Sequence, residues 1–569
     1  MKNRIFVMLF IFLGLLTFSQ AAVDIFDPLY EDIKIWEKTG LINNVPSIRP
    51  YPLQEIKRIL DIVIEKGTDK QIKKAEQYKK RLFGKIFHFG GLTEFNIKAP
   101  GGQKNFAFAP LLELNFSLNE IFTASAHVNF SLLNKLPKDE TLPAFQFSKK
   151  DIFPDDSVVG SFTLLPMFNS GVAIGTPEYY FSAAMSRASF GPFGENNIII
   201  GEQAFHGGQF IFVVNKEKFT YNQIFSAISA SNDFGSSYSP NKFLAGHSIN
   251  FRPLPWISIE LLDLIIYGGR LEPIYFIPLS AFFIGQSIYA FPDNSLLGLT
   301  FGIKPIQGLK IDLVLLADDL GFNEIIKFKD ARWRMSGQLG ISYAIPKDHW
   351  FTLVDLNYTL VTPYCYTHFH NDIKGKPNYE NYTHNGIPLG SNLQPNSDRI
   401  ILKTKFTPIE GFAINLSNTF IRHANVTESV TDPTILKEYL TTEKYATDGS
   451  VFNHSAIFDT WWKHAFRYST PFLTQQTIQY VNQLGLEGVV NLPILKSGGL
   501  MQFKFGYTFE TNINPGVNNH IYNEKIDPTT LTSDEQILEA ANRKLKEWRE
   551  KAVGKEFNHY FNIGVKISY

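Results

Sequence analysis

The chain has 569 residues, and its 54 basic residues balance its 54 acidic ones, which argues against the basic surface that a nucleic-acid partner requires. A mean hydropathy of −0.09 excludes a helical membrane protein, and the single cysteine, Cys365, excludes an internal disulfide framework. Yet 14% of the residues are aromatic, with 51 Phe and 24 Tyr, which is high for a soluble domain and typical of membrane β-barrels with aromatic girdles.

The N-terminus is typical of an export signal. Lys2 and Arg4 precede an almost wholly apolar run from Ile5 to Phe18, and Ser19-Gln20-Ala21 offers the small residues that a signal peptidase recognises. The apolar run is too short to span a bilayer as a helix, which needs roughly 20 residues. We therefore predict that residues 1–21 are a cleaved signal peptide and that the protein is secreted, periplasmic or in the outer membrane.

Residues 22–85 are predicted to form a small helical segment. Start and stop signals delimit three helices: Asp27-Pro28 to Gly40, Pro52 to Gly67, and a charged helix from about Lys70 to Lys80. The segment is too small to bury much core alone. We expect it to lie in the periplasm and to pack against the mouth of a barrel formed by residues 86–569.

From residue 86 the pattern changes to alternation of apolar and polar residues, with turn residues between the segments. This pattern predicts an all-β fold, a transmembrane antiparallel β-barrel of about eighteen strands. A barrel of this size encloses an aqueous channel unless something fills it. The strands are expected near residues 87–99, 105–118, 121–133, 179–191, 195–200, 208–215, 217–230, 244–253, 256–267, 297–305, 309–317, 335–345, 350–362, 398–406, 411–422, 479–493, 499–512 and 556–569.

The predicted connections alternate in length. Short ones are expected at 119–120, Pro192-Phe193-Gly194, 215–216, 253–255, 306–308, 346–348, 408–410 and 497–498. The connections between them are mostly long, above all 134–178, 363–397 and 423–478. The loop before the final strand carries a predicted helix, Ser533 to Lys551, which we interpret as a lid. Outer-membrane barrels have short periplasmic turns and longer extracellular loops. We therefore predict that the short connections face the periplasm and the long ones face outward.

The last predicted strand ends the chain. The residues Phe561, Ile563, Val565, Ile567 and Tyr569 are apolar and alternate with polar residues or glycine, so that one face can meet lipid and the other a wet interior. A half-buried terminal strand of a soluble protein also fits this alternation. Together with the export signal, the aromatic end favours the interpretation that this strand is the signal recognised by the barrel-assembly machinery. This interpretation predicts that the protein is in the bacterial outer membrane.

Several polar and aromatic motifs follow one another between about residues 200 and 400. They are His247, Trp256, Asp263, Tyr267-Gly268-Gly269-Arg270, Tyr275 to Leu279, Asp293-Asn294, Asp318-Asp319, the run from Tyr382 to Gly390, and Asp398. In this order they resemble the capsule-assembly (Wzi-type) family of outer-membrane proteins, in which a small helical unit also precedes an eighteen-stranded barrel. The chain departs from many relatives at Phe276-Ile277-Pro278, where an asparagine amide is missing.

The resemblance implies a lectin-like surface barrel that holds exported polysaccharide without covalent chemistry. Most of the similar residues fall in predicted outer loops, where aromatic faces can stack on sugars and charged groups can bind hydroxyls. The candidate carbohydrate ligands are Arg270, Asp293, Asn294, Asp318, Asp319, Arg332, Arg334, Tyr382, His384, Trp461 and Trp462. The alternative is that these groups pair with one another to pack the loops, and the two tryptophans also fit a membrane-interface anchor.

Signals for an enzyme or a metal site are weak. His368, His370 and Asp372 lack a spaced partner set, and adjacent side chains such as Asp318 and Asp319 point to opposite faces of a strand. We expect no enzyme activity, cofactor or metal, and a monomer whose partners are outer-membrane lipid, surface polysaccharide and the barrel-assembly machinery. A general or selective porin is the main alternative, and an adhesin or assembly partner that uses the long loops stays open.

Overall fold

The computed structural model describes most of the chain. The described residues are 23–118, 121–134, 142–146, 157–159, 162–204, 206–229, 241–291, 293–318, 334–368, 380–384, 387–441, 472–493 and 499–568. The predicted signal peptide and the terminal Tyr569 lie outside these residues. No helix among them is both long and apolar enough to cross a membrane.

Eighteen antiparallel strands in the described residues close into a barrel, which confirms the predicted fold class. Successive strands of this set pair around the ring, and β2 pairs with β23 from Gly90 opposite Ser568 to Ala99 opposite His559. Closure leaves no strand edge with unpaired backbone groups, as a lipid environment requires. The strands are β2 (Phe87–Ala99), β3 (Gln103–Leu118), β4 (Phe122–Leu133), β6 (Phe162–Thr176), β7 (Tyr179–Ser186), β9 (Gly207–Lys216), β10 (Phe219–Ser229), β11 (Asn241–Leu254), β12 (Ile257–Gly268), β13 (Asn294–Ile306), β14 (Leu309–Asp318), β15 (Met335–Ala344), β16 (Phe351–Val361), β19 (Ser397–Ile409), β20 (Phe412–Ala424), β21 (Ile478–Pro493), β22 (Leu500–Ile513) and β23 (Lys555–Ser568), with a short β5 (Ser157–Val159) beside β6.

Side chains alternate between the lumen and the outer surface along each strand. On β23, Phe561, Ile563 and Ile567 are exposed on the outer face. Asn558 and Tyr560, on the other face of the same strand, are buried towards the lumen. The strand therefore has the apolar outer band and polar inner face that the sequence pattern predicts for an outer-membrane barrel.

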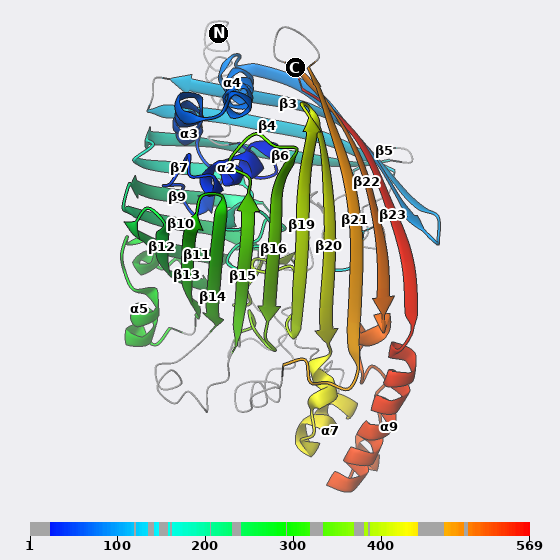
Figure 1. Ribbon diagram of the computed structural model, residues 1–569. Helices are drawn as coiled ribbons and strands as arrows, with labels where there is room; N and C mark the ends of the chain where they lie inside the picture. The colour runs from blue at the N-terminus through cyan, green and yellow to red at the C-terminus, as the bar shows by residue number, and fades with distance from the viewer. Residues whose placement is uncertain are drawn as a thin grey trace, which may run out of the picture.

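The connections are sorted by length between the two ends of the barrel. At the short-turn end, neighbouring strands such as β9 and β10 are joined by only a few residues, whereas connections such as 269–293 and 514–554 define the long-loop end. Figure 1 shows the N-terminal helices and the C-terminus at the short-turn end, at the top of the view. The helices α7 (Pro433–Thr441) and α9 (Asp534–Ala552) lie at the long-loop end, at the bottom (Figure 1).

The N-terminal segment folds into three helices close to the predicted positions: α2 (Pro28–Lys38), α3 (Leu53–Lys66) and α4 (Asp69–Phe83). Asp27 caps α2 by accepting a hydrogen bond from the Leu29 backbone N–H at 2.9 Å. The helices share a buried apolar core that includes Trp36. An ion pair of 2.7 Å between Lys73 and Glu410 joins α4 to the turn between β19 and β20, so the segment packs against the short-turn end.

Two predictions between residues 134 and 206 are wrong. One wall strand was not predicted and one predicted strand is not in the wall, so the predicted number of eighteen strands still agrees with the structure. The expected loop 134–178 contains β6, in which Pro166 and Gly171 weaken the strand pattern. The expected strand 195–200 is not part of the wall; its apolar residues are buried inside the barrel. The short turn of this region is therefore at 177–178 and not at Pro192-Phe193-Gly194. A short apolar run does not by itself distinguish a wall strand from a packed loop.

A helical cap stands at the long-loop end. It contains α9, which confirms the helix predicted from Ser533 to Lys551, and α7, which the sequence pattern did not indicate. Ser533 begins α9 with a capping box, and Trp548 packs in an apolar cluster shared with α7. Arg549 donates to the buried Glu428 carboxylate at 2.7 Å, which ties α9 to the connection after β20.

The outward face of β23 provides a test of the membrane assignment. Ile563 lies near the middle of the strand and is 50% exposed, so Ile563→Arg would place a charge in the bilayer. We expect this change to lower the free energy of unfolding by about 2–4 kcal/mol, measured by urea denaturation in lipid vesicles. The control Ile563→Leu should stay within about 1.5 kcal/mol of the wild type. An Arg variant as stable as the wild type would contradict the assignment of this face to lipid.

Candidate functional site

Segments from three parts of the chain meet inside the barrel and form what we call the plug. They are residues 43–51 after α2, residues 187–204 between β7 and β9, and the described parts of the β16–β19 connection (362–368, 380–384 and 387–396). The short strand β1 (Ile48–Arg49) pairs with β8 (Ser189–Phe190). The Gly201 backbone N–H donates to the Leu389 carbonyl at 2.8 Å, which joins the second segment to the third.

An apolar core fills the space between the plug and one side of the wall. Ile198, Ile199 and Ile200 of the plug are at most 2% exposed. They belong to one cluster with inward-facing wall residues from Tyr180 of β7 round to Val481 of β21. Closely packed apolar interiors of this kind hold no water. This side of the lumen is therefore a packed core and not a channel.

Two of the predicted carbohydrate ligands, Tyr382 and His384, are buried in the plug. The Tyr382 hydroxyl donates to the Ile199 carbonyl at 2.7 Å, and its ring stacks on Tyr366 with 5.4 Å between centroids. His384 Nδ1 accepts from the Ser229 backbone N–H at 2.8 Å. Both side chains tie the β16–β19 connection to neighbouring segments, as expected if these residues pack the loops.

Asp318 and Asn294 are also buried, at the long-loop ends of β14 and β13. One oxygen of the Asp318 carboxylate accepts from the Tyr366 backbone N–H at 2.5 Å. The Asn294 amide donates to the Glu380 carbonyl at 3.0 Å. Wall residues thus hold the plug in place through its backbone.

Arg270 and Asp293 form a bidentate ion pair at the base of the β12–β13 connection, with N–O distances of 3.0 and 2.5 Å. The Tyr275 hydroxyl donates to the same carboxylate at 2.7 Å, and the Phe291 ring centroid lies 4.3 Å from the guanidinium carbon. Asp293 is buried, whereas the Arg270 side chain is 31% exposed. Among the predicted ligands within the described residues, only Arg270 is not buried.

Of the remaining predicted ligands, Arg334 is buried, whereas Asp319, Arg332, Trp461 and Trp462 lie outside the described residues. They belong to the β14–β15 and β20–β21 connections, whose flanking strands meet the long-loop end. The described part of the chain does not bring the predicted ligand set together in one pocket.

The histidine-rich stretch after β16 is described only in part. His368 Nδ1 lies 2.9 Å from the Glu380 carboxylate, whereas His370 and Asp372 lie outside the described residues. In the part of the chain that the structure describes, no group of three His, Cys, Asp or Glu side chains is placed to hold a metal ion.

Sequence reasoning missed three buried cations that bind backbone carbonyls of the plug: Arg49, Arg187 and Lys242. Arg49 donates to the Phe193 carbonyl at 2.7 Å, and Lys242 donates to the Thr383 carbonyl at 2.6 Å. Charged donors satisfy carbonyls that burial removes from water. No local pattern marks these pairs, because the partners are 144 and 141 residues apart.

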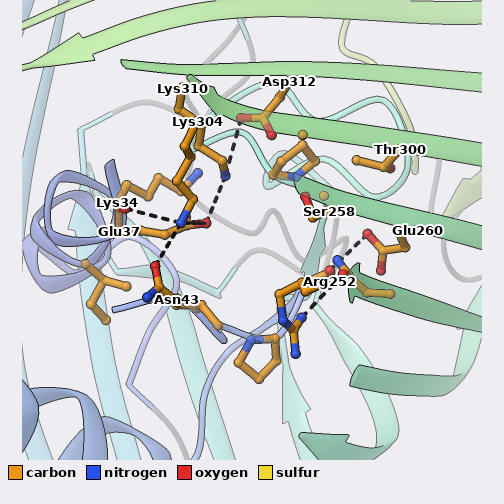
Figure 2. A pocket seen from close by; sticks show the side chains of 18 of the residues that line it. Lys34, Glu37, Asn43, Arg252, Ser258, Glu260, Thr300, Lys304, Lys310 and Asp312 are labelled. Carbon is orange, nitrogen blue, oxygen red and sulfur yellow. Dashed lines mark hydrogen bonds and ion pairs between the residues drawn. The ribbon is translucent and has the colours of Figure 1, made fainter. Parts of the chain in front are cut away.

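A charged cavity lies between α2, the plug and the wall (Figure 2). Five cationic and three acidic side chains line it: Lys34, Arg49, Arg252, Lys304 and Lys310 with Glu37, Glu260 and Asp312. The Lys310 ammonium lies 3.0 Å from the Glu37 carboxylate and 3.3 Å from that of Asp312. This network joins α2 to β14.

The charges in the cavity shift the pKa values of the α2 residues that face it. Burial by itself raises the pKa of Glu37, but the ammonium groups of Lys310 and Lys304 outweigh it and hold the pKa at about 2. Burial, reinforced by the nearby charges of Arg49 and Lys38, lowers the pKa of Lys34. Glu37 is therefore ionised at neutral pH and stabilises the docked position of α2.

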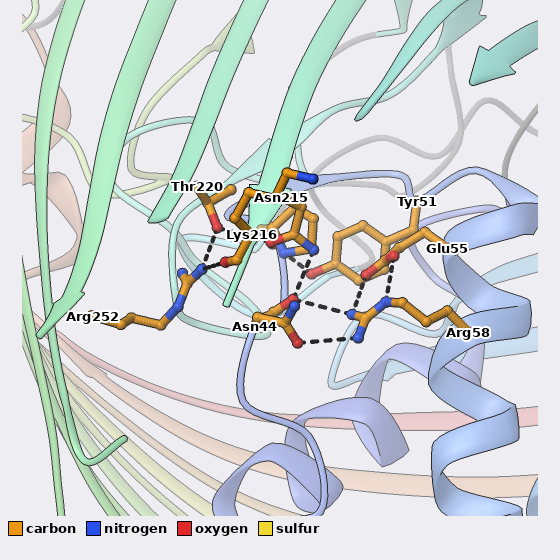
Figure 3. Close-up of polar contacts among 9 residues, drawn as sticks. Asn44, Tyr51, Glu55, Arg58, Asn215, Lys216, Thr220 and Arg252 are labelled. Carbon is orange, nitrogen blue, oxygen red and sulfur yellow. Dashed lines mark hydrogen bonds and ion pairs between the residues drawn. The ribbon is translucent and has the colours of Figure 1, made fainter. Parts of the chain in front are cut away.

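A second group of polar contacts joins the N-terminal segment to β9 (Figure 3). Within α3, Arg58 donates twice to the Glu55 carboxylate, at 2.8 and 2.6 Å. Arg58 also donates to the Asn44 carbonyl at 3.1 Å, and the Asn215 amide of β9 donates to the same carbonyl at 2.9 Å. Asn44 therefore links α3 directly to the wall.

Beside the apolar core, polar side chains of β21, β22 and β23 line the lumen. Glu510 of β22 is 1% exposed and accepts hydrogen bonds from Asn558 and Tyr560 of β23, both at 3.1 Å. Its second oxygen accepts from the Gln483 amide at 2.9 Å and from the Ala144 backbone N–H at 2.7 Å. This polar wall presents carboxylate, amide and hydroxyl groups towards the lumen.

Comparison with solved structures places the fold among outer-membrane barrels. Wzi, an outer-membrane protein involved in group 1 capsule assembly in Escherichia coli and described as a carbohydrate-binding β-barrel, is 14% identical, with a TM-score of 0.54 over 96% of this chain and 98% of that chain. Two Pseudomonas aeruginosa proteins also match: OccD3 (OpdP), with 9% identity and a TM-score of 0.39 over 86% and 92% of the two chains, and OprD, with 8% identity and 0.39 over 85% and 94%. At such identities the likeness to Wzi shows a shared fold.

Comparisons by sequence add no family assignment. No protein-family model matches the chain. No curated protein matches it either.

The depressed pKa of Glu37 predicts how docking of α2 depends on pH. The pKa of Glu37 falls from its usual 4.5 to about 2 on folding, so its contribution is fully present above pH 4.5 and is lost as the pH falls towards 2. The contribution is roughly 3 kcal/mol, or about 100-fold in the hydrogen-exchange protection of α2. Glu37→Gln should remove this protection at pH 7 and flatten its pH dependence.

Glu65→Gln, on the exposed face of α3, is the matched control and should leave the protection of α2 unchanged. Equal protection of α2 in wild type and Glu37→Gln at pH 7 would show that the ion pairs do not hold the helix.

Proposed function

We propose that the protein is a closed outer-membrane barrel that binds polysaccharide at its long-loop end and performs no covalent chemistry. The observation that supports the closed state is the apolar core between the plug and the wall from β7 to β21. Ile199 and Tyr366 are buried there, whereas a diffusion channel needs a continuous aqueous path. A plug of this kind favours a barrel that presents an outer surface over one that conducts solutes.

The glycan-binding part of the proposal has two supports. The motifs between about residues 200 and 400 resemble those of capsule-assembly barrels, and Wzi, which shares the fold, is described as carbohydrate-binding. We assign the sugar contacts to Asp319, Arg332, Trp461 and Trp462, which supply charged and stacking groups, together with the partly exposed Arg270. The buried ligands of the predicted set then act indirectly, by fixing the plug beneath this surface.

The same proposal sets the orientation in the membrane. The long-loop end faces outward, and the N-terminal segment lies in the periplasm after removal of residues 1–21. The final strand, up to Tyr569, is then the part that the barrel-assembly machinery recognises before the chain enters outer-membrane lipid as a monomer.

A substrate-selective channel is the second candidate, and the polar wall around Glu510 favours it. Carboxylate, amide and hydroxyl groups of this kind line selective pores. Asn558 and Tyr560 of β23 and Gln483 of β21 supply them here, next to Glu510 of β22.

Tryptophan substitutions test where polysaccharide binds. Trp461→Ala should weaken retention of purified protein on immobilised acidic or neutral polysaccharide roughly five-fold, because it removes a stacking contact of about 1 kcal/mol. The control is Trp350→Ala, since Trp350 is 56% exposed in the β15–β16 turn at the other end of the barrel. Equal retention by the wild type and both variants would remove the proposed site.

Conductance separates the closed barrel from the channel. In planar bilayers we expect no steady openings from the wild type, because the apolar core packs the plug against the wall from β7 to β21. Ile199→Asp, which puts a carboxylate into the core, should produce openings, and Ile199→Val should not. Steady nanosiemens openings from the wild type would overturn the closed-barrel proposal and favour the channel.

A further inference from the structure

The β12–β13 connection, residues 269–293, folds back over the outside of the barrel wall. It contains a short 3-10 helix, η2 (Pro273–Phe276), and α5 (Phe282–Tyr289), which Figure 1 shows outside the ring of strands at the lower left. The Phe276 ring centroid lies 4.1 Å from that of Phe225 on β10. Phe225 is paired with Phe210 of β9, which is 47% exposed on the lipid-facing side. The connection therefore packs on the outer face of the wall.

A row of polar side chains lies beneath the connection. Gln223, His247 and Asp263 stand opposite one another on β10, β11 and β12. They share the outer face with Leu261, two residues before Asp263 and 55% exposed. Unpaired polar groups are strongly disfavoured in hydrocarbon, so a polar row at this depth of the wall needs a cover.

The connection supplies that cover. The Gln223 amide donates to the Phe276 carbonyl at 3.1 Å, and the Phe283 backbone N–H donates to the Asp263 carboxylate at 3.3 Å. The Phe282 ring centroid lies 4.3 Å from that of His247. The connection thus covers the polar row, with hydrogen bonds to Gln223 and Asp263 and a ring contact to His247.

The outer surface of the connection is itself apolar. Its exposed residues are Leu271, Phe276, Ile277, Leu279, Ile284, Ile288 and Tyr289. The twenty residues from Pro273 to Pro292 include no Asp, Glu, Lys, Arg or His. Charged residues stand only at its two ends, where Arg270 pairs with Asp293. A contiguous exposed apolar surface of this kind marks contact with a partner or a membrane.

We propose that residues 273–291 form a flap embedded in the hydrocarbon layer, with its exposed face in contact with lipid acyl chains. Lipid is the occupant because the flap continues the apolar outer band of the wall. The flap also reaches far along that band: the Leu279 backbone N–H donates to the hydroxyl of Tyr221, the third residue of β10 after the short turn. A loop extended into water would leave both its apolar face and the polar row exposed.

The flap widens the lipid-facing surface of the barrel over β10, β11 and β12 and keeps their polar row out of the bilayer. The Arg270–Asp293 pair closes the base of the flap at the long-loop end. This inference requires only that the barrel lies in a membrane, and it does not depend on polysaccharide binding.

Spin labelling at Ile288, which is 71% exposed on α5, tests the proposal in the full-length protein. Ile288→Cys is labelled with a nitroxide and reconstituted in phosphatidylcholine vesicles, and collision rates are measured with oxygen, which partitions into lipid, and with a nickel chelate, which stays in water. Leu261→Cys on the outer wall of β12 is the lipid reference, and Glu539→Cys on the exposed face of α9 is the water reference. The wild type, whose only cysteine is buried, gives the background labelling.

The proposal requires the Ile288 label to behave as the Leu261 label does, with high oxygen and low nickel accessibility. A nickel accessibility like that of the Glu539 label would place the flap in water and overturn the proposal. Low accessibility to both reagents would show that a protein surface covers the flap, either a second copy of this chain or another protein, and would overturn lipid as the occupant.

Discussion

The rest of the structure depends on the closure of eighteen strands into one ring. In a membrane every backbone N–H and carbonyl needs a partner, and closure meets that need at the cost of a wide lumen. The plug fills part of this wide lumen, where it forms an apolar core with the wall. Its irregular backbone then needs donors of its own, and Arg49 and Lys242 supply them.

Local signals in the sequence were sufficient for most of the wall and for the helices. The first strand was expected at 87–99, as found, and the capping residues Asp27 and Ser533 marked the starts of α2 and α9. The errors arose where burial is decided by distant parts of the chain. Ile198-Ile199-Ile200 has the composition of a strand, but its neighbours in space are the plug and the inner wall.

The candidate site was predicted only as a set of residues. Motif and resemblance selected side chains that do lie around the plug, but the contacts of Tyr382 with Ile199 and of His384 with Ser229 join positions 183 and 155 residues apart. No periodicity encodes such pairs. A weaker signal was present for the flap: Asp263 occupies an outward position between Leu261 and Ile265, where alternation calls for an apolar residue.

The pairing of Ile48 with Phe190 has a consequence for the order of folding. Residues 43–51 are synthesised early, yet their partners in β8 follow about 140 residues later, and the strand that closes the ring on Gly90 is the last of the described strands. Contacts between such distant positions form slowly, because the intervening chain must first be ordered. Residues 48–49 therefore cannot pair before β8 is available, and the ring cannot close before β23 is formed.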